Sequence, residues 1–226
     1  MSFRASFFML LCGMKEVSRV GENRENPISV RSKRRITDAL LELMQVTPFS
    51  KISIKDIVDR AGLTRQTFYH NFETKEDVLL CRVDEHFEGF LKYLSKKKIS
   101  DYEDVICCFF RYWQEHADFV HLLMESNQVY LLSLKMPGYF QTVKKLHFDK
   151  AGLTDAEARL WYAFVSGALV STLASWLTAP GGLSARALAK LVLTMMDGTM
   201  LEKSRIEPVT EVSEIIDHLQ SGSKNG

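Results

Sequence analysis

The sequence predicts an all-α fold with a small N-terminal group of three helices and a larger helical body behind it. Apolar residues recur at spacings of three and four along most of the chain, and alternating runs are few. Only 5 Pro and 12 Gly occur among 226 residues, too few for a linker-rich or all-β protein. With 46% hydrophobic and 25% charged residues, the chain has the composition of a globular protein.

The first two predicted helices follow from an apolar stripe and a start signal. "VRSKRRITDALLELMQV" predicts a helix of about four turns from Val30 to near Thr47-Pro48. "SIKD" is a capping box of Ser53 and Asp56, and an apolar face at i, i+3, i+4 and i+7 follows it. Gly62 is expected to end this second helix, because it accepts the left-handed backbone of a tight turn.

A third helix is expected from Thr64, as N-cap, to about His70. Its apolar residues Phe68 and Phe72 should hold it against the first two helices. Thr74 and Asp77 form another capping box, which predicts a long helix from Lys75 to about Ser95.

The remaining elements are read from further start and stop signals. Ser100 with Glu103 is expected to cap a helix through "VICCFFRYWQEH", and "DFVHLLMES" should form another. Pro137-Gly138 predicts a break. Thr154 with Glu157 should cap a long helix that stops at residues 180–182, and Ser184 should cap "ARALAKLVLTMM".

The stretch "LTRQTFYHNF" suits contact with DNA. A helix, a Gly-containing turn and a second short helix form a helix-turn-helix, whose second helix enters the major groove with its N-terminal residues. Arg65 and Gln66 are the candidate base readers, because they pair bidentately with guanine and adenine. Phosphate contacts are expected from the following residues: Ser53, Thr64, Thr67, Tyr69, His70 and Lys75.

The charge distribution agrees with that assignment. Residues 28–72 hold eight Lys or Arg against four Asp or Glu, whereas the whole chain has a net charge of +1. A local basic excess is expected where a protein meets phosphates. The alternative is a small helical corner with a solvated polar face.

Residues 52–79, "ISIKDIVDRAGLTRQTFYHNFETKEDVL", resemble the TetR family of bacterial transcription regulators. The resemblance implies a helix-turn-helix DNA-binding domain, a homodimer on a near-palindromic operator, and a C-terminal domain for dimerisation and effector binding. Residues 161–193 are similar to the subgroup that includes the activator of dihydroxyacetone kinase operons. The chain departs from that subgroup at residues 70 and 71, where it has His-Asn instead of Tyr-His.

The helix over residues 160–179 carries no charge and has a length that could cross a membrane. Its bulky residues share one side, and small residues the other, which suits a helix between its own core and a close neighbour. By the resemblance, this small side and the next helix build the dimer interface. The expected interface residues are Gly167, Ala168, Ser171, Ser175, Thr178, Leu188, Leu191 and Met195.

An effector pocket is expected among large side chains of the body. The resemblance implies that a small-molecule or protein effector acts there, and the candidate residues are Phe90, Phe109, Trp113, His116 and Met124. Plain core packing is the alternative for each of them. No Ser/His/Asp order, HExxH, P-loop or dinucleotide fingerprint points to an enzyme, and no cofactor or metal is expected.

The expected organisation is an N-terminal extension over residues 1–27, a DNA-binding domain over 28–74, a body over 75–206 and a tail over 207–226. Four cysteines without metal or CxxC spacing indicate reduced thiols and a cytoplasmic protein. The predicted function is a repressor without membrane contact. The alternatives are a membrane-tethered regulator through residues 160–179 and a helical adaptor that does not bind DNA.

Overall fold

The computed structural model describes residues 27–147, 154–179 and 182–196, and these form nine α-helices and one short 3-10 helix. No strand occurs among these residues, so the all-α prediction is confirmed. The expectations for residues 1–26 and for the tail from residue 207 lie outside the described residues. Residues up to Ala189 form one compact unit, to which the packing below belongs, and residues from Lys190 belong to another.

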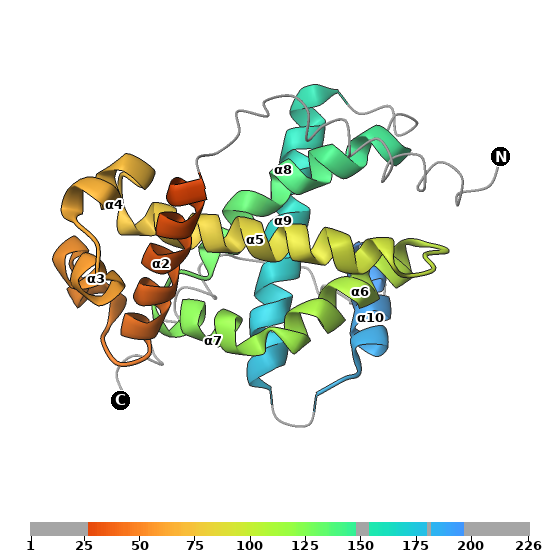
Figure 1. The fold of residues 1–226 in the computed structure, drawn as a ribbon. Coiled ribbons are helices and arrows are strands. Elements are labelled where there is room, and N and C mark those ends of the chain that lie inside the picture. The colour runs from red at the N-terminus through yellow and green to blue at the C-terminus, as the bar shows by residue number, and fades with distance from the viewer. Residues whose placement is uncertain (1–26, 148–153, 180–181, 197–226) are drawn as a thin grey trace, which may run out of the picture. The chain divides into compact units, whose positions relative to one another are not determined.

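The head, defined as α2 to α4, packs around a small apolar core (Figure 1). It consists of α2 (Pro27–Met44), a 3-10 turn (Phe49–Lys51), α3 (Ile54–Ala61) and α4 (Arg65–Asn71). Its centre contains fully buried apolar side chains from all three helices: Ile36, Leu40, Ile57 and Phe68. The first helix begins three residues before the predicted start, because Pro27 suits the first turn of a helix.

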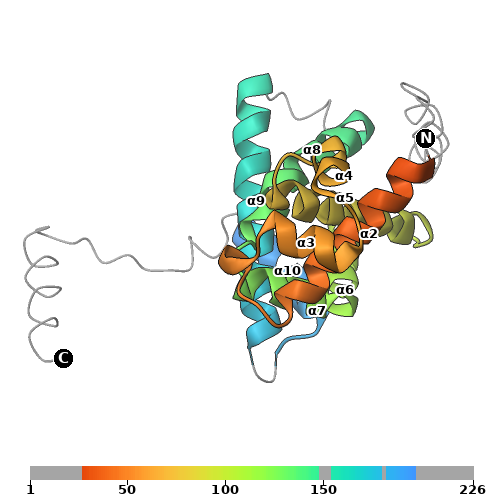
Figure 2. The same cartoon turned by 60° about the vertical axis from the view of Figure 1, so that its left-hand side comes forward.

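Helix α5 (Lys75–Ser95) connects the head to the body. It begins at the predicted Thr74–Asp77 capping box and ends at the predicted residue. In Figures 1 and 2 the head lies at its N-terminal end, and α5 continues from there among the body helices. It packs against α2 on the head side and against α6 and α8 on the body side.

The body, defined as α5 to α9 and the start of α10, is a layered group of helices. The helices after α5 are α6 (Tyr102–Glu115), α7 (Ala117–Glu125), α8 (Tyr130–His147), α9 (Asp155–Thr178) and α10 (Ala185–Met196). Helix α9 lies behind α5 in Figure 1 and packs against α6, α7 and α8. The largest fully buried side chains of the body include Trp113, Phe110, Leu123, Leu131 and Leu173.

Two predicted boundaries in the body are wrong. Helix α6 is capped by Asp101, whose carboxylate accepts the backbone N–H of Asp104 at 2.9 Å, and not by Ser100 with Glu103. Helix α8 continues through Pro137 without a break. A proline inside a helix removes one backbone hydrogen bond, and here packing against α5 and α9 holds the helix together around that gap.

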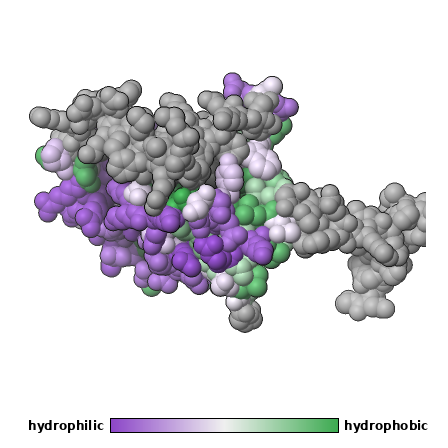
Figure 3. All heavy atoms as spheres, turned by 90° about the vertical axis from the view of Figure 1, so that its right-hand side faces the viewer, coloured by the Kyte–Doolittle hydropathy of each residue, from purple (hydrophilic) through white to green (hydrophobic). Residues whose placement is uncertain are grey.

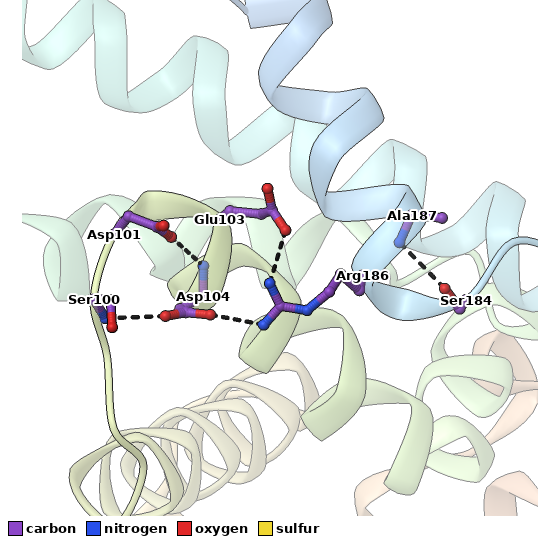
Figure 4. A network of polar contacts seen from close by, with 7 residues as sticks. All are labelled: Ser100, Asp101, Glu103, Asp104, Ser184, Arg186 and Ala187. Atoms are coloured by element: carbon purple, nitrogen blue, oxygen red, sulfur yellow. Dashed lines mark hydrogen bonds and ion pairs between the residues drawn. The ribbon is translucent and has the colours of Figure 1, made fainter.

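An ion-pair fork fastens the start of α10 to the start of α6 (Figure 4). The guanidinium of Arg186 donates to Glu103 at 2.8 Å and to Asp104 at 2.7 Å. Asp104 also accepts the backbone N–H of Ser100, and these bonds hold the pKa of its carboxyl below the ordinary value. Ser184 caps α10 as predicted, through the N–H of Ala187.

His86 lies midway along α5, half-buried among aromatic rings. Its ring stacks on Phe119 with 4.4 Å between centroids and meets His116 edge-on at 5.0 Å. Burial, with the charges of Arg82 and His116, lowers the pKa of His86 from 6.5 to about 4. The imidazole is therefore neutral at pH 7, and among the described residues its Nε2 has no hydrogen-bond partner.

We expect the free energy of unfolding to decrease as the pH is lowered from about 6.5 to about 4. In this window the unfolded chain binds a proton at His86 that the folded chain excludes, so protons favour unfolding. The expected loss is about 1–2 kcal/mol, after allowance for the partial exposure of the ring. Chemical denaturation at a series of pH values measures it.

The matched variants are His86→Phe, which keeps an aromatic ring against Phe119, and His70→Gln, which changes an exposed histidine of the head. His86→Phe should be less sensitive to pH across this window, and His70→Gln should behave like the wild type. An unchanged pH dependence in His86→Phe would show that another group causes the loss.

Candidate nucleic-acid interface

The two helices α3 and α4 form the predicted helix-turn-helix. Ser53 and Asp56 make a complete capping box at the start of α3, and Gly62 ends it with φ 61° and ψ 44°. Around this left-handed residue the N–H of Leu63 donates to Val58 O at 2.9 Å. The turn therefore has the backbone that a glycine accepts without a steric penalty, as predicted from the sequence.

One face of α4 is buried and fixes its orientation. Phe68 is fully buried, Phe72 is 7% exposed, and their rings lie 6.0 Å apart. Phe68 also meets the ring of Tyr69 edge-on at 5.6 Å. Since α4 has only seven residues, this packing and not helix propensity holds it in place.

The opposite face of α4 presents the two predicted base readers to solvent. Arg65 and Gln66 are exposed at the first two positions of the helix and have no hydrogen bond or ion pair with any described residue. Tyr69 is 58% exposed, and His70 is exposed beside it. Arg65 and Gln66 can therefore reach a ligand without breaking a side-chain hydrogen bond or ion pair with any described residue.

The three hydroxyl residues predicted to contact phosphate are engaged in helix capping. Ser53 Oγ donates to Asp56 at 2.6 Å, and this bond helps to lower the pKa of Asp56. Thr64 Oγ1 accepts the N–H of Thr67 at 3.1 Å and lies 2.9 Å from Thr67 Oγ1. The capping box thus uses the N–H of Asp56 in the first turn of α3, which donates to Ser53 Oγ at 3.3 Å.

The side chain of Lys75 points back into the head. Its Nζ donates to Phe49 O at 2.6 Å and to Ile52 O at 2.9 Å, and it lies 4.4 Å from the centroid of the Phe49 ring. Two of its three ammonium hydrogens are thus used inside the protein. The sequence predicted a phosphate contact for Lys75 and gave no sign of this bond, because the carbonyls lie more than twenty residues earlier in the chain.

Sequence reasoning also missed a contact that fixes the C-terminal end of α4. The side chain of Asn71 donates to Thr67 O at 2.7 Å and accepts a bond of 2.7 Å from the hydroxyl of Ser29 on α2. Asn71 is one of the two residues at which the chain departs from the resembling subgroup. That difference in sequence was the only sign that Asn71 has a special role. In the structure, Asn71 links α4 to α2 through its hydrogen bond with Ser29.

Basic side chains surround the interface, and some are paired. Arg60 Nε and Nη2 both donate to Glu42 Oε2, at 2.7 and 2.6 Å, which ties α3 to α2. Arg35 Nη2 lies 3.4 Å from Gly62 O, beside the turn. Arg31, Lys55 and Arg65 are exposed and have no ion pair with a described residue. The local positive charge predicted from the sequence is therefore partly available to phosphates.

The residues of the predicted effector pocket are only partly brought together. Phe109 meets Phe90 at 5.9 Å and Trp113 at 6.2 Å between ring centroids, whereas His116 stacks on Tyr112 at 4.3 Å. Trp113 is fully buried, and among the described residues its Nε1 has no partner. Met124 is half-buried on α7.

A surface hollow of about 200 Å³ lies away from these residues, at the end of α9. It is lined by Gln114, Trp176, Leu177, Ala179, Gly182 and Leu183. None of the five predicted pocket residues lines this hollow. Their assignment to an effector site stays a prediction.

Helix α9 has the two faces that the sequence predicted. Val165, Leu169 and Leu173 are buried, whereas Gly167, Ser171, Ser175 and Thr178 are exposed and Ala168 is half-buried. The exposed face continues toward the N-terminus with two large apolar residues, Leu160 at 73% and Phe164 at 59% exposure. Among the coloured residues of Figure 3, hydrophobic surface gathers toward the right of the view and hydrophilic surface toward the left.

The predicted interface residues of α10 differ in exposure. Leu188 is 5% exposed, so its side chain packs inside the chain and offers little surface to a partner. Leu191 is half-buried and Met195 is 49% exposed. The dimer interface stays a prediction.

By length and composition alone, α9 is also long and apolar enough to cross a membrane. Only 33% of its most apolar window is buried within the chain. The core helix of a soluble protein passes the same test, so this is weak evidence for a membrane.

Comparisons with known proteins agree on the head. Residues 36–80 match the model of the bacterial regulatory proteins, tetR family. Over 72 residues the chain is 33% identical to the HTH-type transcriptional regulator EthR of Mycolicibacterium smegmatis, covering 32% of this chain and 30% of that protein. Over 102 residues it is 26% identical to the HTH-type dhaKLM operon transcriptional activator DhaS of Lactococcus lactis, covering 45% of this chain and 48% of that protein.

A solved structure extends the likeness in fold to the body. A TetR transcriptional regulator from Streptococcus agalactiae has a TM-score of 0.52 and 20% sequence identity, covering 74% of this chain and 94% of that chain. At this identity the likeness concerns the fold alone. The two curated relatives are matched over less than half of their own length.

We expect Gly62→Ala to destabilise the head by about 1–2 kcal/mol, because a side chain at φ 61° is strained. The added Cβ would also lie 2.9 Å from Arg35 Nη2, the mobile end of an exposed side chain. Gly62→Asn is the matched variant, since asparagine tolerates the left-handed region better. Chemical denaturation should show that the free energy of unfolding falls from the wild type to Gly62→Asn and then to Gly62→Ala. If Gly62→Ala were as stable as the wild type, the left-handed turn at residue 62 would be contradicted.

Proposed function

We propose that this chain, whose residues 36–80 match the bacterial regulatory proteins of the tetR family, is a regulator of that family that binds a near-palindromic DNA operator as a homodimer and represses transcription. The observation that carries the proposal is that Arg65 and Gln66, at the start of α4, are exposed and that their side chains have no hydrogen bond or ion pair with a described residue. A helix with such an N-terminus fits the major groove, where Arg and Gln read guanine and adenine. Tyr69, His70 and the basic residues around them supply phosphate contacts.

The homodimer is proposed on the basis of the exposed face of α9. This face combines small residues, which permit close approach of a second helix, with Leu160 and Phe164, which need cover. A second copy of the chain covers both stretches at once. It also provides the second head that a two-fold symmetric operator requires, with half-sites about one helical turn apart.

Control by a small-molecule or protein effector is proposed to act through α5. On the body side Asp84 binds Lys135 Nζ at 2.6 Å and Tyr139 Oη at 3.1 Å, both from α8. The ring of Tyr139 also stacks on Phe87, with 4.6 Å between centroids. An effector that shifts α8 would thereby move α5 and change the separation of the two heads. In fewer of the dimers would this separation then match the spacing of the operator half-sites.

A membrane-tethered regulator is the second candidate, because α9 is long and apolar enough to span a bilayer. We propose a cytoplasmic protein, since the exposed face of α9 contains Ser171, Ser175 and Thr178, which a lipid-facing helix would not favour. Membrane fractionation of the expressed chain separates the two candidates. The third candidate, a helical adaptor protein that does not bind DNA, would be recognised because it binds no DNA duplex.

We expect Arg65→Ala and Gln66→Ala to change which bases are preferred, each by roughly 1–3 kcal/mol at one position of each half-site. Selection of bound duplexes from a random pool, with wild type and each variant, measures this and reports symmetry and half-site spacing. Arg159→Ala, an exposed arginine on α9, is the matched control and should select the wild-type site. Wild-type preference in both head variants would remove these residues from base reading.

We expect Ser171→Arg to convert the dimer to a monomer, because it places a charge at the centre of the exposed α9 face. Sedimentation should show this, and operator affinity should fall roughly a hundredfold or more as the two heads become separate. Glu125→Arg, on an exposed position of α7, is the control and should remain a dimer. A dimeric Ser171→Arg would mean that another surface joins the copies.

A further inference from the structure

Buried nitrogen atoms without a partner lie where α5 meets α6. Arg82 Nε and His86 Nε2 belong to α5, Trp113 Nε1 belongs to α6, and none of them has a hydrogen-bond partner among the described residues. Arg82 and His86 are one helical turn apart and share a face of α5. The rings of His86 and Trp113 lie 5.6 Å apart between centroids, and the charge of Arg82 acts on the imidazole. The three atoms therefore form one group, which we call the nitrogen cluster.

The nitrogen cluster offers hydrogen-bond donors. The Nε–H of an arginine and the N–H of an indole can only donate, and His86 Nε2 donates in one of its two neutral tautomers. A buried donor without an acceptor costs free energy, and a buried indole N–H usually finds a partner. Trp113 is fully buried, so bulk solvent does not supply that partner. The missing group is therefore one that accepts several hydrogen bonds, as an oxygen-bearing ligand does.

The charges around the nitrogen cluster favour a negatively charged ligand. The charges of Arg82 and His116 both lower the pKa of His86, and no acidic side chain acts against them. Glu85 does bind Arg82 Nη1, at 2.7 Å, but 48% of its side chain is exposed, and solvent screens such a pair. The inner side of the guanidinium thus lies in a positive field. A carboxylate supplies the opposite charge and accepts bonds at both of its oxygens.

The nitrogen cluster leads from the surface into an aromatic part of the body. The side chain of Arg82 is 36% exposed, whereas Trp113 is fully buried. Between these depths the ring of His86 stacks on Phe119 of α7, with 4.4 Å between centroids, and meets His116 edge-on at 5.0 Å. A ligand that enters beside Arg82 therefore meets flat, largely apolar rings. An apolar body attached to the carboxylate suits these surroundings.

We propose that Arg82, His86 and Trp113 bind the carboxylate of an effector whose remaining part is apolar. Arg82 Nε and Trp113 Nε1 donate to its two oxygens, and His86 Nε2 donates a third bond. The inference rests on the proposed function, because it gives the proposed effector a chemical class. Asp84 lies two residues from both Arg82 and His86, and therefore on the opposite side of α5, where it binds Lys135 of α8. A ligand at the nitrogen cluster thus acts directly on the helix that connects body and head.

The binding test uses benzoate and octanoate as probes, with benzamide and octanamide as their uncharged counterparts. Full-length wild type is compared with Trp113→Phe, Arg82→Met and Glu85→Gln. The chain has three tryptophans, and Trp113→Phe identifies the indole signal of Trp113 in spectra of 15N-labelled protein. This variant also removes one donor and keeps an aromatic ring. Glu85→Gln is the matched control, because it removes the exposed ion pair and leaves Arg82 in place.

At least one carboxylate should shift the indole signal of Trp113 until it saturates, and neither amide should do so at the same concentration. Calorimetry should show that Arg82→Met and Trp113→Phe bind this carboxylate roughly tenfold more weakly than the wild type, and Glu85→Gln no more weakly. The bound probe should also raise the pKa of His86, since a nearby negative charge favours the imidazolium. If neither carboxylate moves the signal, or if the amides bind equally well, the proposal is overturned.

The regulatory part is tested by operator binding at saturating carboxylate. The wild type should bind the operator roughly tenfold more weakly than without the probe, and the same concentration should have little effect on Arg82→Met. An operator affinity that the saturating probe leaves unchanged would overturn the assignment of the carboxylate as an effector. Should the wild type bind no duplex, the proposed function fails, while the indole signal and calorimetry still decide the carboxylate site.

Discussion

The burial of Phe68 is the interaction on which the interface depends. Helix α4 has seven residues and would not be stable alone, so its direction is set by this fully buried ring in the core of α2 and α3. Because side chains on a helix face opposite ways at fixed offsets, burying Phe68 turns Arg65 and Gln66 outward. A loss of core packing would therefore disturb the proposed reading of DNA bases without a change in either residue.

Helix α5 extends this constraint from the head to the body. Its first residue binds the α2–α3 turn, and nine residues later Asp84 binds Lys135 and Tyr139 of α8. Burial and the nearby carboxylate raise the pKa of Tyr139, which keeps its hydroxyl a donor to Asp84. A helix gripped at both places transmits a shift of α8 as a movement of its N-terminal end, because a continuous helix is stiff over this length. Under the proposed control by an effector, both sets of contacts are needed to couple the body to the head.

What the sequence predicted correctly is local. The boxes at Ser53, Thr74 and Thr154 and the left-handed Gly62 depend on residues within one turn, and all are confirmed. The expected break at Pro137 is wrong, because packing from distant helices overrides a single proline. Lys75 and Asn71 bind partners more than twenty residues away, and no local pattern carries such pairing. The same reason explains Leu188, whose burial depends on packing that its own helix pattern does not reveal.

The composition of the exposed face of α9 bears on whether this helix faces a lipid bilayer or a second copy of the chain. A spanning helix needs apolar side chains around its whole circumference, whereas this face has two large apolar residues at one end and hydroxyl residues toward the other. Thr178 Oγ1 donates to Ala174 O, so this hydroxyl is satisfied within the helix and can lie against a protein neighbour. Ser171 and Ser175 leave room for close helix approach, and Phe164 supplies the apolar area that makes the approach favourable. The proposed second copy would meet all of these conditions if a two-fold axis set the small stretch of one helix opposite its counterpart.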